Sequence, residues 1–415
     1  MEKSEKRSSS GNESIPYLSP EITTEILCKL PIDSVLRCRC VCKAWCYLTK
    51  SPAFIEQLLS SNVDKPPSLI LEPNCAENDS TQPFLFVDIG GHRVRQVCID
   101  PLKGLSAMGT CRGLLCVGSL SALDPVFVFN PVTREYRRLP TSGEKVINGH
   151  QVGLSFNPST GKYEVLRTYV HEGRRCFEVT TLGASSWRKL DVPNHWEAYF
   201  VYEPVFWNRT IHWKASATAC DFLLSFDVCH EKFRKISFPK DISSFGIRPR
   251  AKDVGHFGLG GRRDDDGQLL LPPQGFVPDG YTHLTTMIEP TELELLGFGG
   301  RLTIVEHDNE QMRLWEMTGD KLEDLSIEFW DEHDTNMEWN SFMTYKVIGW
   351  WSPECYLLKV SDCYGDIWNP KKHFTQFLLE RANYLPLDIP SLPSIPSMFI
   401  TVRGYEPSLV SPETA

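Results

Sequence analysis

The chain lacks any run of apolar residues long enough to cross a membrane. A spanning helix needs about 18 or more consecutive apolar residues, and no such run occurs in the 415 residues. The first residues, MEKSEKRSSSGNES, also lack the apolar core of a secretory signal peptide. We therefore expect a folded protein of the cytoplasm, the nucleus or both that is neither secreted nor embedded in a membrane.

Motifs of the common catalytic centres are also missing. The sequence has no HExxH pair, no GxSxG turn and no Gly-rich loop ending in Lys-Ser or Lys-Thr. Its 11 His are scattered. Asp264-Asp265-Asp266 could bind a hard cation, but we favour a solvated charge run. We expect no catalytic residues, no cofactor and no metal, and hence a protein that is not an enzyme.

The 14 Cys occur in a chain without an export signal. We therefore expect reduced, mostly buried thiols rather than a disulfide framework. Cys38, Cys42 and Cys46 are four residues apart, which would place them on one face of a continuous helix. A zinc site needs about four converging ligands, and no second pair with ligand spacing follows. We favour small, buried core residues over a metal site.

Residues 17–59 have the pattern of three short helices. Ser19 is a hydroxyl N-cap and Pro20 suits the first helical position. The apolar residues of this first helix recur every fourth position until a proline ends it: Ile22, Ile26, Leu30, Pro31. Asp33 is the expected cap of a second helix bearing Val35, Leu36, Val41 and Trp45. Ser51-Pro52 is the expected start of a third, with Phe54, Ile55, Leu58 and Leu59.

So short a helical unit has too much apolar surface for its size. About forty residues seldom fold alone without a metal, disulfides or a partner. The segment therefore has the character of a docking module, and a plain N-terminal helical cap is the less favoured interpretation.

The same segment resembles an F-box, the motif by which many proteins join SCF ubiquitin ligases through a Skp-type adaptor. The resemblance rests on Pro20-Glu21-Ile22, Ile26-Leu27, Leu30-Pro31, the run Leu36 to Trp45 (LRCRCVCKAW) and Ser51-Pro52-Ala53-Phe54. One departure is that Ser19 separates Leu18 from Pro20, where the family has Leu directly before Pro. The resemblance implies that the adaptor contacts Leu18, Pro20, Ile22, Ile26, Leu30, Pro31, Leu36, Val41, Cys42 and Trp45.

Beyond Pro66-Pro67 short β-branched and aromatic runs alternate with Asn-Pro, Gly and Asp turns. One unit recurs as FVFNPVTREY (127–136), LSFNPSTGKY (154–163) and LSFDVCHEKF (224–233), with a degenerate copy, DIWNPKKHF, at 366–374. Asn or Asp starts a tight turn, and we expect the later aromatic residue to pack across the hairpin. The pattern predicts four-stranded sheets at 67–100, 104–140, 152–193, 204–239, 293–329 and 345–378, and hence an all-β propeller of about six blades.

Residues 240–290 interrupt this spacing. They contain a Gly-rich run, residues 255–267, followed by Pro272-Pro273. Low hydrophobicity favours a mobile loop insertion. The alternative is a phosphate-binding loop, which would need a strand before it and a helix after it, and neither is evident.

An F-box followed by GTCRGLLCV, DPVFVFNPVTREYRRLP, VGLSFNPSTGKYEVL and LLSFDVCHEKFRKISFP looks like the plant F-box-associated (kelch-like) proteins. The resemblance implies an α+β multidomain protein: a disordered tail at 1–15, the F-box at 16–60, a linker at 61–66, the propeller at 67–408 and a C-terminal tail at 409–415. Regular Gly-Gly pairs of kelch repeats are absent; Gly299-Gly300 is the best candidate.

The charge of the chain is unevenly distributed. Residues 131–263 contain 21 Lys/Arg and 13 Asp/Glu, a net charge of +8, whereas residues 264–415 contain 9 and 26, a net charge of −17. The two segments suit partners of opposite sign. The overall charge of −10 disfavours nucleic acid. The acidic run 320–338 is interpreted as solvated surface, with a loop that docks a basic target as the alternative.

Four tryptophans fall in expected strands: Trp187, Trp213, Trp315 and Trp368. Because each buries a large apolar area, we expect them in the core between blades rather than on a recognition surface.

The resemblance implies a substrate receptor of an SCF ubiquitin ligase. The F-box would bind the adaptor, and through it cullin and RING subunits, while the propeller would hold a target for ubiquitination and proteasomal degradation. An adaptor-binding scaffold or competitor that delivers no target is the alternative. A propeller enzyme, such as a sugar oxidase or lactonase, is a third and less favoured function because no converging ligands form a motif.

Overall fold

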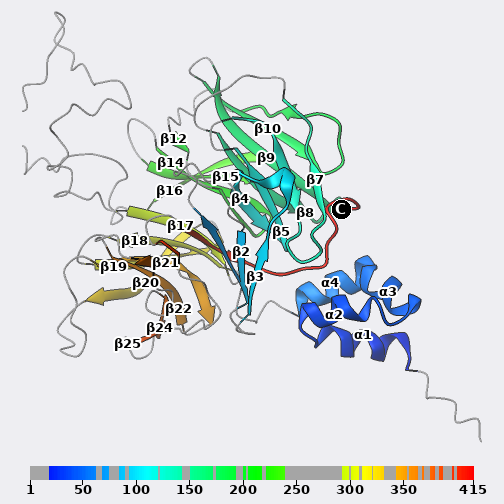
Figure 1. The fold of residues 1–415 in the computed structure, drawn as a ribbon. Coiled ribbons are helices and arrows are strands. Elements are labelled where there is room, and N and C mark those ends of the chain that lie inside the picture. The colour runs from blue at the N-terminus through cyan, green and yellow to red at the C-terminus, as the bar shows by residue number, and fades with distance from the viewer. Residues whose placement is uncertain are drawn as a thin grey trace, which may run out of the picture. The chain divides into compact units, whose positions relative to one another are not determined.

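The computed structural model describes residues 18–61, 68–73, 84–88, 93–119, 122–142, 150–171, 174–192, 200–201, 204–216, 221–238, 292–298, 301–307, 311–319, 321–330, 343–352, 355–362, 367–368, 374–378, 383–386, 395–396 and 400–415. The chain divides between residues 62 and 63 into two compact units (Figure 1). The first is helical and the second is built of β-sheets. The expected insertion at 240–290 and the pair Gly299-Gly300 lie outside the described residues.

The helical unit has four helices: α1 (Pro20–Cys28), α2 (Ile32–Cys38), α3 (Lys43–Lys50) and α4 (Pro52–Ser60). Two of the expected caps are confirmed. The hydroxyl of Ser19 accepts a hydrogen bond from the Ile22 amide at 3.3 Å, and that of Ser51 accepts one from the Phe54 amide at 3.3 Å. Each hydroxyl satisfies one of the amide groups that a helix start leaves without a partner.

The prediction of three helices is wrong because the second one breaks. Its last bonds join residues three apart, from the amides of Arg39, Cys40 and Val41 to the carbonyls of Leu36, Arg37 and Cys38. Cys42 then has extended backbone, and its Sγ accepts a hydrogen bond from the Trp45 amide at 3.4 Å, so it caps a new helix. The predicted cap Asp33 instead lies in the first turn of α2, which begins after Pro31.

The core of the helical unit is small and apolar. α1, α2 and α4 contribute its fully buried members: Leu27, Cys28, Val35, Phe54 and Leu58. Leu27 and Cys28 share a face with Thr23, four residues before Leu27, and Phe54 and Leu58 are spaced by four on α4. This spacing places each pair on one side of its helix.

The second unit consists mainly of antiparallel sheets. The β4–β7 sheet contains β4 (Ser106–Cys111), β5 (Leu114–Gly118), β6 (Val126–Phe129) and β7 (Tyr136–Arg138), after a short 3-10 turn at Asp100–Leu102. The β8–β11 sheet contains β8 (Gln151–Asn157), β9 (Lys162–His171), β10 (Arg174–Thr181) and β11 (Arg188–Lys189).

The β12–β16 sheet contains β12 (Phe200–Val201), β13 (Val205–Trp207), β14 (Thr210–Ser216), β15 (Asp221–Asp227) and β16 (Lys232–Ser237). The β17–β20 sheet contains β17 (Glu292–Phe298), β18 (Arg301–His307), β19 (Gln311–Thr318) and β20 (Lys321–Trp330). The β21–β25 sheet contains β21 (Met343–Ser352), β22 (Cys355–Asp362), β24 (Phe374–Leu378) and β25 (Asn383–Pro386). A separate pair joins β23 (Ile367–Trp368) to β26 (Ile395–Pro396).

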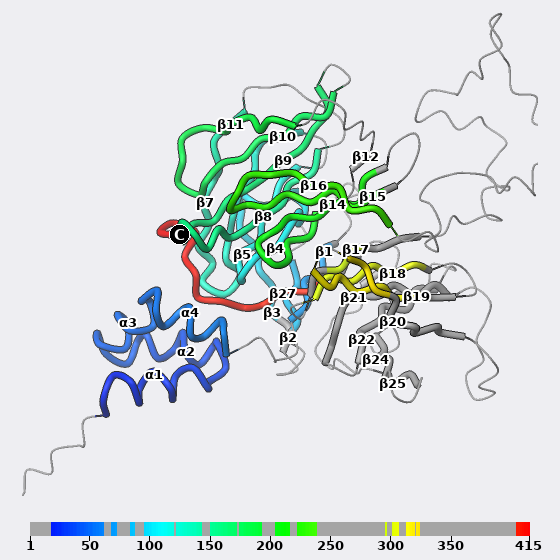
Figure 2. The backbone as a smooth tube through the Cα atoms, turned by 180° about the vertical axis from the view of Figure 1, so that it is seen from behind, coloured from blue at the N-terminus to red at the C-terminus, as the bar shows by residue number. Residues whose placement is uncertain are grey.

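The remaining sheet, here called the closing sheet, joins the two ends of the β unit. It combines β1 (Ser68–Pro73), β2 (Phe84–Asp88) and β3 (Arg93–Val97) with β27 (Ile400–Tyr405), in the order β27-β1-β2-β3. Ser68 pairs with Tyr405 and Pro73 with Ile400. Figures 1 and 2 show β27 beside β1 from both sides.

Successive sheets contact one another along the chain. β4 contacts β8, β8 contacts β13, β13 contacts β17, β17 contacts β21 and β21 contacts β27. The closing sheet in turn packs on the β4–β7 sheet, because one buried cluster contains Phe86 and Tyr405 of the former and Phe129 of the latter. The predicted β-propeller is confirmed.

The prediction of about six blades is wrong, because only five of the described sheets have the four strands of a blade. Five sheets have four strands, the β12–β16 sheet has five, and β23 and β26 stand apart as a pair. The extra strand arises because β12 and β13 pair with opposite ends of β14. Pro204, which has no N–H for the ladder, lies between them. Residues 67–100 supply only three strands of their blade, since the fourth comes from β27.

The expected hairpin packing of the repeats is confirmed. Phe156 pairs with Tyr163 across its hairpin with ring centroids 5.0 Å apart, and Phe226 pairs with Phe233 at 4.8 Å.

The tryptophans agree with the prediction in part. Trp213 and Trp315 are buried in clusters that span neighbouring sheets. Trp187 is half-buried and precedes β11 rather than lying in a strand. Its indole N–H donates to the Pro140 carbonyl at 2.6 Å. Trp368 lies in β23, and its side chain is outside the described part.

The acidic run is not a loop over its first half, because residues 321–330 form β20. Residues 331–338 lie outside the described residues.

Candidate functional site

The outer face of α1 is apolar. Ile22 and Ile26, one helical turn apart, are 49% and 45% exposed, and Leu18 precedes them with 49% exposure. The opposite face of the same helix carries the buried Leu27 and Cys28. The helix is therefore apolar on both sides, and only one side has a partner within the described part of this unit.

The turn between α2 and α3 extends this apolar surface. Val41 is 65% exposed, Cys42 is exposed, and Leu36 and Trp45 are half-buried. The turn is held in place by Arg39, whose Nη2 donates to the Thr49 carbonyl at 3.2 Å.

None of the ten residues proposed from sequence to contact an adaptor belongs to the buried core of the helical unit. Seven are exposed: Leu18, Pro20, Ile22, Ile26, Pro31, Val41 and Cys42. Three are partly buried: Leu30, Leu36 and Trp45. The core is formed by other residues, so the ten remain available at the surface.

Sequence reasoning missed one member of this surface. Tyr47 on α3 is 76% exposed, the largest exposure of any large hydrophobic side chain in the described residues. The helical period would place it opposite the buried Thr49 once α3 is known to begin at Lys43. The sequence prediction runs the second helix on through this segment, so it could not show which side of α3 carries Tyr47.

The break also changes the reading of the cysteines. Cys42 and Cys40 are exposed, and Cys38 and Cys46 are half-buried, so the prediction of buried core thiols is wrong for this group. Of the ten cysteines whose side chains the structure describes, only Cys28, Cys111 and Cys116 are buried. None of these ten is joined in a disulfide. Within the described residues no group of three or more His, Cys, Asp or Glu could hold a metal ion, and no helix there is long and apolar enough to span a bilayer.

In the propeller, the repeat asparagines join separate parts of the chain. Asn130 is fully buried, and its Oδ1 accepts hydrogen bonds from the amides of Val132 and Thr133. Its Nδ2 donates to the carbonyls of Ser408 and Val410 at 3.0 and 2.7 Å. The segment after β27 is thereby fixed on the β4–β7 sheet (Figures 1 and 2).

Asn157 acts in the same way between two sheets. Its Oδ1 accepts from the Ser159 amide at 3.0 Å, and its Nδ2 donates to the Val228 carbonyl of the β12–β16 sheet at 3.1 Å. The third copy has Asp227, which keeps the turn by accepting from the amides of Cys229 and His230. A carboxylate has no amide protons to donate, so its outer oxygen faces His230 at 3.0 Å and Arg234 at 3.8 Å.

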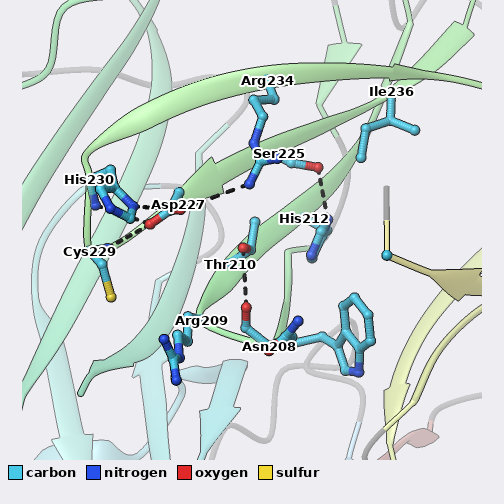
Figure 3. Close-up of a pocket in the computed structure, with 12 residues that line it drawn as sticks. Asn208, Arg209, Thr210, His212, Ser225, Asp227, Cys229, His230, Arg234 and Ile236 are labelled. Atoms are coloured by element: carbon cyan, nitrogen blue, oxygen red, sulfur yellow. Dashed lines mark hydrogen bonds and ion pairs between the residues drawn. The ribbon is translucent and has the colours of Figure 1, made fainter. Parts of the chain in front are cut away.

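A pocket of about 240 Å³ opens beside Asp227 (Figure 3). Its walls come from the β13–β14 turn, strands β14 to β16, and Gly319 after β19. Figure 3 shows Asp227 between His230 and Arg234, with His212 and Ser225 on the adjoining strands.

The charge state of this pocket follows from burial and hydrogen bonding. Burial lowers the pKa of His212 to about 3, although a backbone hydrogen bond at Trp207 opposes the shift. His212 is therefore neutral at pH 7, with Nδ1 2.8 Å from the Ser225 hydroxyl. Burial would raise the pKa of Asp227, but hydrogen bonds from His230 and the Cys229 amide outweigh it and hold that pKa below its usual range. Asp227 is thus a carboxylate.

Two family models match the sequence. One, described as "F-box domain", matches residues 15–57, and the other, "F-box associated beta propeller domain", matches residues 93–253. The putative F-box protein At1g32420 of Arabidopsis thaliana is 30% identical over 244 residues, which cover 56% of this chain and 77% of that protein. The F-box protein At5g49610 of the same plant is 30% identical over 249 residues, 54% of this chain and 64% of that protein.

A further relative, the putative F-box protein At1g47730, is also matched over 64% of its length. The chain therefore spans less than two thirds of At5g49610 and At1g47730. Among solved structures, an oligogalacturonate lyase in complex with manganese aligns with 10% identity and a TM-score of 0.38, over 77% of this chain and 78% of that one. No inference is drawn from a likeness this weak.

Proposed function

Because the chain belongs to the F-box proteins and carries an F-box-associated β-propeller, we propose that it is the substrate receptor of an SCF-type ubiquitin ligase. An F-box implies a Skp-type adaptor as partner. Cullin and RING subunits would join through that adaptor. The propeller would hold a target protein, raising its concentration near the ubiquitin-conjugating enzyme without bond chemistry of its own.

One observation supports the adaptor contact most directly. The helical unit builds its core without any of the ten adaptor residues, while Leu18, Ile22, Ile26 and Val41 stay 45–65% exposed. Apolar side chains on so small a unit are stabilised when a partner covers them. The surface of α1 and the α2–α3 turn, here called the docking face, is the proposed adaptor site.

Ile26 on α1 and Leu30, which follows the helix, provide the test. Ile26→Asp places a charge on the docking face, where adaptor binding would bury it without a partner. We expect affinity for a recombinant Skp-type adaptor to fall at least about thirtyfold, roughly 2 kcal/mol. Leu30→Asp should act alike. Binding is measured by titration of the full chain, with helical circular dichroism as the check on folding.

Two control variants distinguish a loss of adaptor binding at the docking face from a loss of folding. Gln57→Asp adds the same charge to an exposed position of α4 outside the docking face, and should leave affinity unchanged. Leu27→Asp enters the core and should lower helical content as well as binding. If Ile26→Asp and Leu30→Asp both bind the adaptor like the unaltered chain, the docking face is wrongly placed.

Target delivery is tested separately. A reconstituted ligase with the full chain should ubiquitinate a captured partner only when the adaptor is present. Captured partners that stay unmodified would favour a scaffold over a receptor.

A further inference from the structure

A second opening adjoins the pocket of Figure 3. The two share Arg234 and Ile236, and the second, about 440 Å³, continues along β16 past Lys235 to Lys321 and Leu322. Together they form one groove, here called the β16 groove, which begins at the Asn208-Arg209 turn. It lies between the β12–β16 and β17–β20 sheets, whose buried residues form one cluster.

The groove runs along the outer strand of a sheet. β16 is the last strand in the order β12-β14-β15-β16, and β20 is the last in β17-β18-β19-β20. Among the described residues β16 pairs only with β15. The outer side of an edge strand is where an extended peptide adds to a sheet.

The charge of the groove is mainly positive. Arg209, Arg234, Lys235 and Lys321 line it, and Asp227 is the one acidic residue among its described lining residues. Asp227 already faces Arg234 and His230. Trp207, Ile236 and Leu322 add apolar surface between the cations.

Arg209 occupies a backbone position that its side chain does not favour. Asn208 and Arg209 have φ of +44° and +63°, the two-residue turn between β13 and β14. This turn prefers Gly at its second position, and Asn-Gly is its commonest sequence. Arginine is therefore strained at this position, where it lines the pocket.

We propose that the β16 groove docks an extended acidic segment of the target protein. The carboxylates of that segment would face Arg209, Arg234 and Lys321, and an apolar side chain would contact Trp207 and Ile236. The proposal rests on the receptor function proposed above. Nucleic acid fits less well, because the chain as a whole carries −10 and would repel a polyanion beyond the groove.

The probe is a degenerate library of peptides about twelve residues long, a length that an edge strand and its flanking turns can contact. It is passed over the full chain immobilised through an affinity tag, and bound peptides are sequenced. We expect enrichment of Asp and Glu with a nearby large apolar residue. Arg209→Glu combined with Lys321→Glu should lower the capture of acidic peptides at least about tenfold.

Two further variants make the result specific. Arg138→Glu combined with Lys162→Glu reverses two exposed cations outside the groove and should leave capture within about twofold. Arg209→Gly suits the turn better than arginine, so it should weaken capture while thermal stability is kept or raised. That combination cannot result from misfolding.

Several results would overturn the proposal: no acidic enrichment, equal loss in both double variants, or full capture by the groove variant. Tighter binding of polyuridylate RNA than of acidic peptides, lost in the groove variant, would assign the groove to nucleic acid instead. Adaptor retention on the column is recorded in each run. A chain that captures acidic peptides but fails to bind the adaptor would contradict the proposed receptor function, while the proposed ligand class of the groove would still hold.

Discussion

Asn130 and Asp227 occupy the same kind of turn, between the third and fourth strands of their sheets, and differ by one chemical group. Both accept backbone hydrogen bonds that close the turn. Only the asparagine has an amide group to donate, and Asn130 uses it on Ser408 and Val410. At this position the amide of Asn130 donates to another segment, whereas the carboxylate of Asp227 faces a pocket.

Asn130→Asp tests this difference. The turn keeps its acceptor, but two buried donors are lost and a carboxylate meets two carbonyl oxygens, so we expect a loss of about 2–3 kcal/mol in the free energy of unfolding. Urea denaturation followed by tryptophan fluorescence measures it. Asp227→Asn is the reverse exchange at a partly exposed position and should change that free energy by less than about 1 kcal/mol. Equal effects would show that the tie to Ser408 and Val410 contributes little.

At the scale of elements, the β4–β7 and β8–β11 sheets are joined by a buried cation. Arg167 on β9 has no exposed surface, donates to Glu178 at 2.6 and 2.9 Å, and lies 3.6 Å from Asp124. Its guanidinium stacks 3.8 Å from the ring centre of Trp187. The hydroxyl of Tyr169 donates to the second oxygen of Glu178 at 2.9 Å. The buried charge of Arg167 is thus compensated mainly by Glu178 and by Asp124.

Glu178→Ala should destabilise the propeller by about 3–5 kcal/mol, because removing one partner leaves a buried charge poorly compensated. The free energy of unfolding is measured by urea denaturation. Glu316→Gln is the control, since it weakens a more exposed pair with Arg301 at 3.1 Å, and it should cost less than about 1 kcal/mol. An equally small loss for Glu178→Ala would mean that water reaches Arg167.

Local elements were the most predictable part of this fold. Ser19 and Ser51 with their following prolines locate two helix starts, and Asn130, Asn157 and Asp227 locate three turns. The break after Cys38 carries no proline or glycine. It depends on a thiol cap and the Arg39 contact with Thr49, neither of which has a periodic signal.

Over the whole molecule, prediction from sequence failed where distant segments meet. β27 completes a sheet begun more than three hundred residues earlier, and no local pattern connects Ser68 with Tyr405. The β16 groove likewise draws on two sheets separated by residues 239–291. Arg209 and Arg234 were visible only as part of the regional charge of +8 at 131–263, and Lys321 lies in the acidic segment 264–415.

The free energy of unfolding of the β unit is expected to depend on pH through two buried histidines. Burial lowers the pKa of His150 to about 4 and of His212 to about 3. Below pH 6.5 the unfolded chain therefore binds protons that the folded chain does not, so stability falls as the pH drops from about 6.5 to about 4. Each histidine contributes up to about 1.4 kcal/mol per pH unit in that window.

Denaturation curves at several pH values measure how the free energy of unfolding changes with pH. Replacing both residues, His150→Gln with His212→Gln, should flatten it, whereas His230→Gln, at an exposed position, should not. An unchanged slope in the double variant would mean that other groups account for the acid sensitivity.

The pairing of β1 with β27 also sets an order of events during synthesis. β1 leaves the ribosome early, but Tyr405, the partner of Ser68, is made more than three hundred residues later. At roughly 5–20 residues per second, β1 waits on the order of tens of seconds with one edge unpaired. The helical unit has all its own contacts by then, so in each new chain the proposed docking face is complete before the propeller has closed.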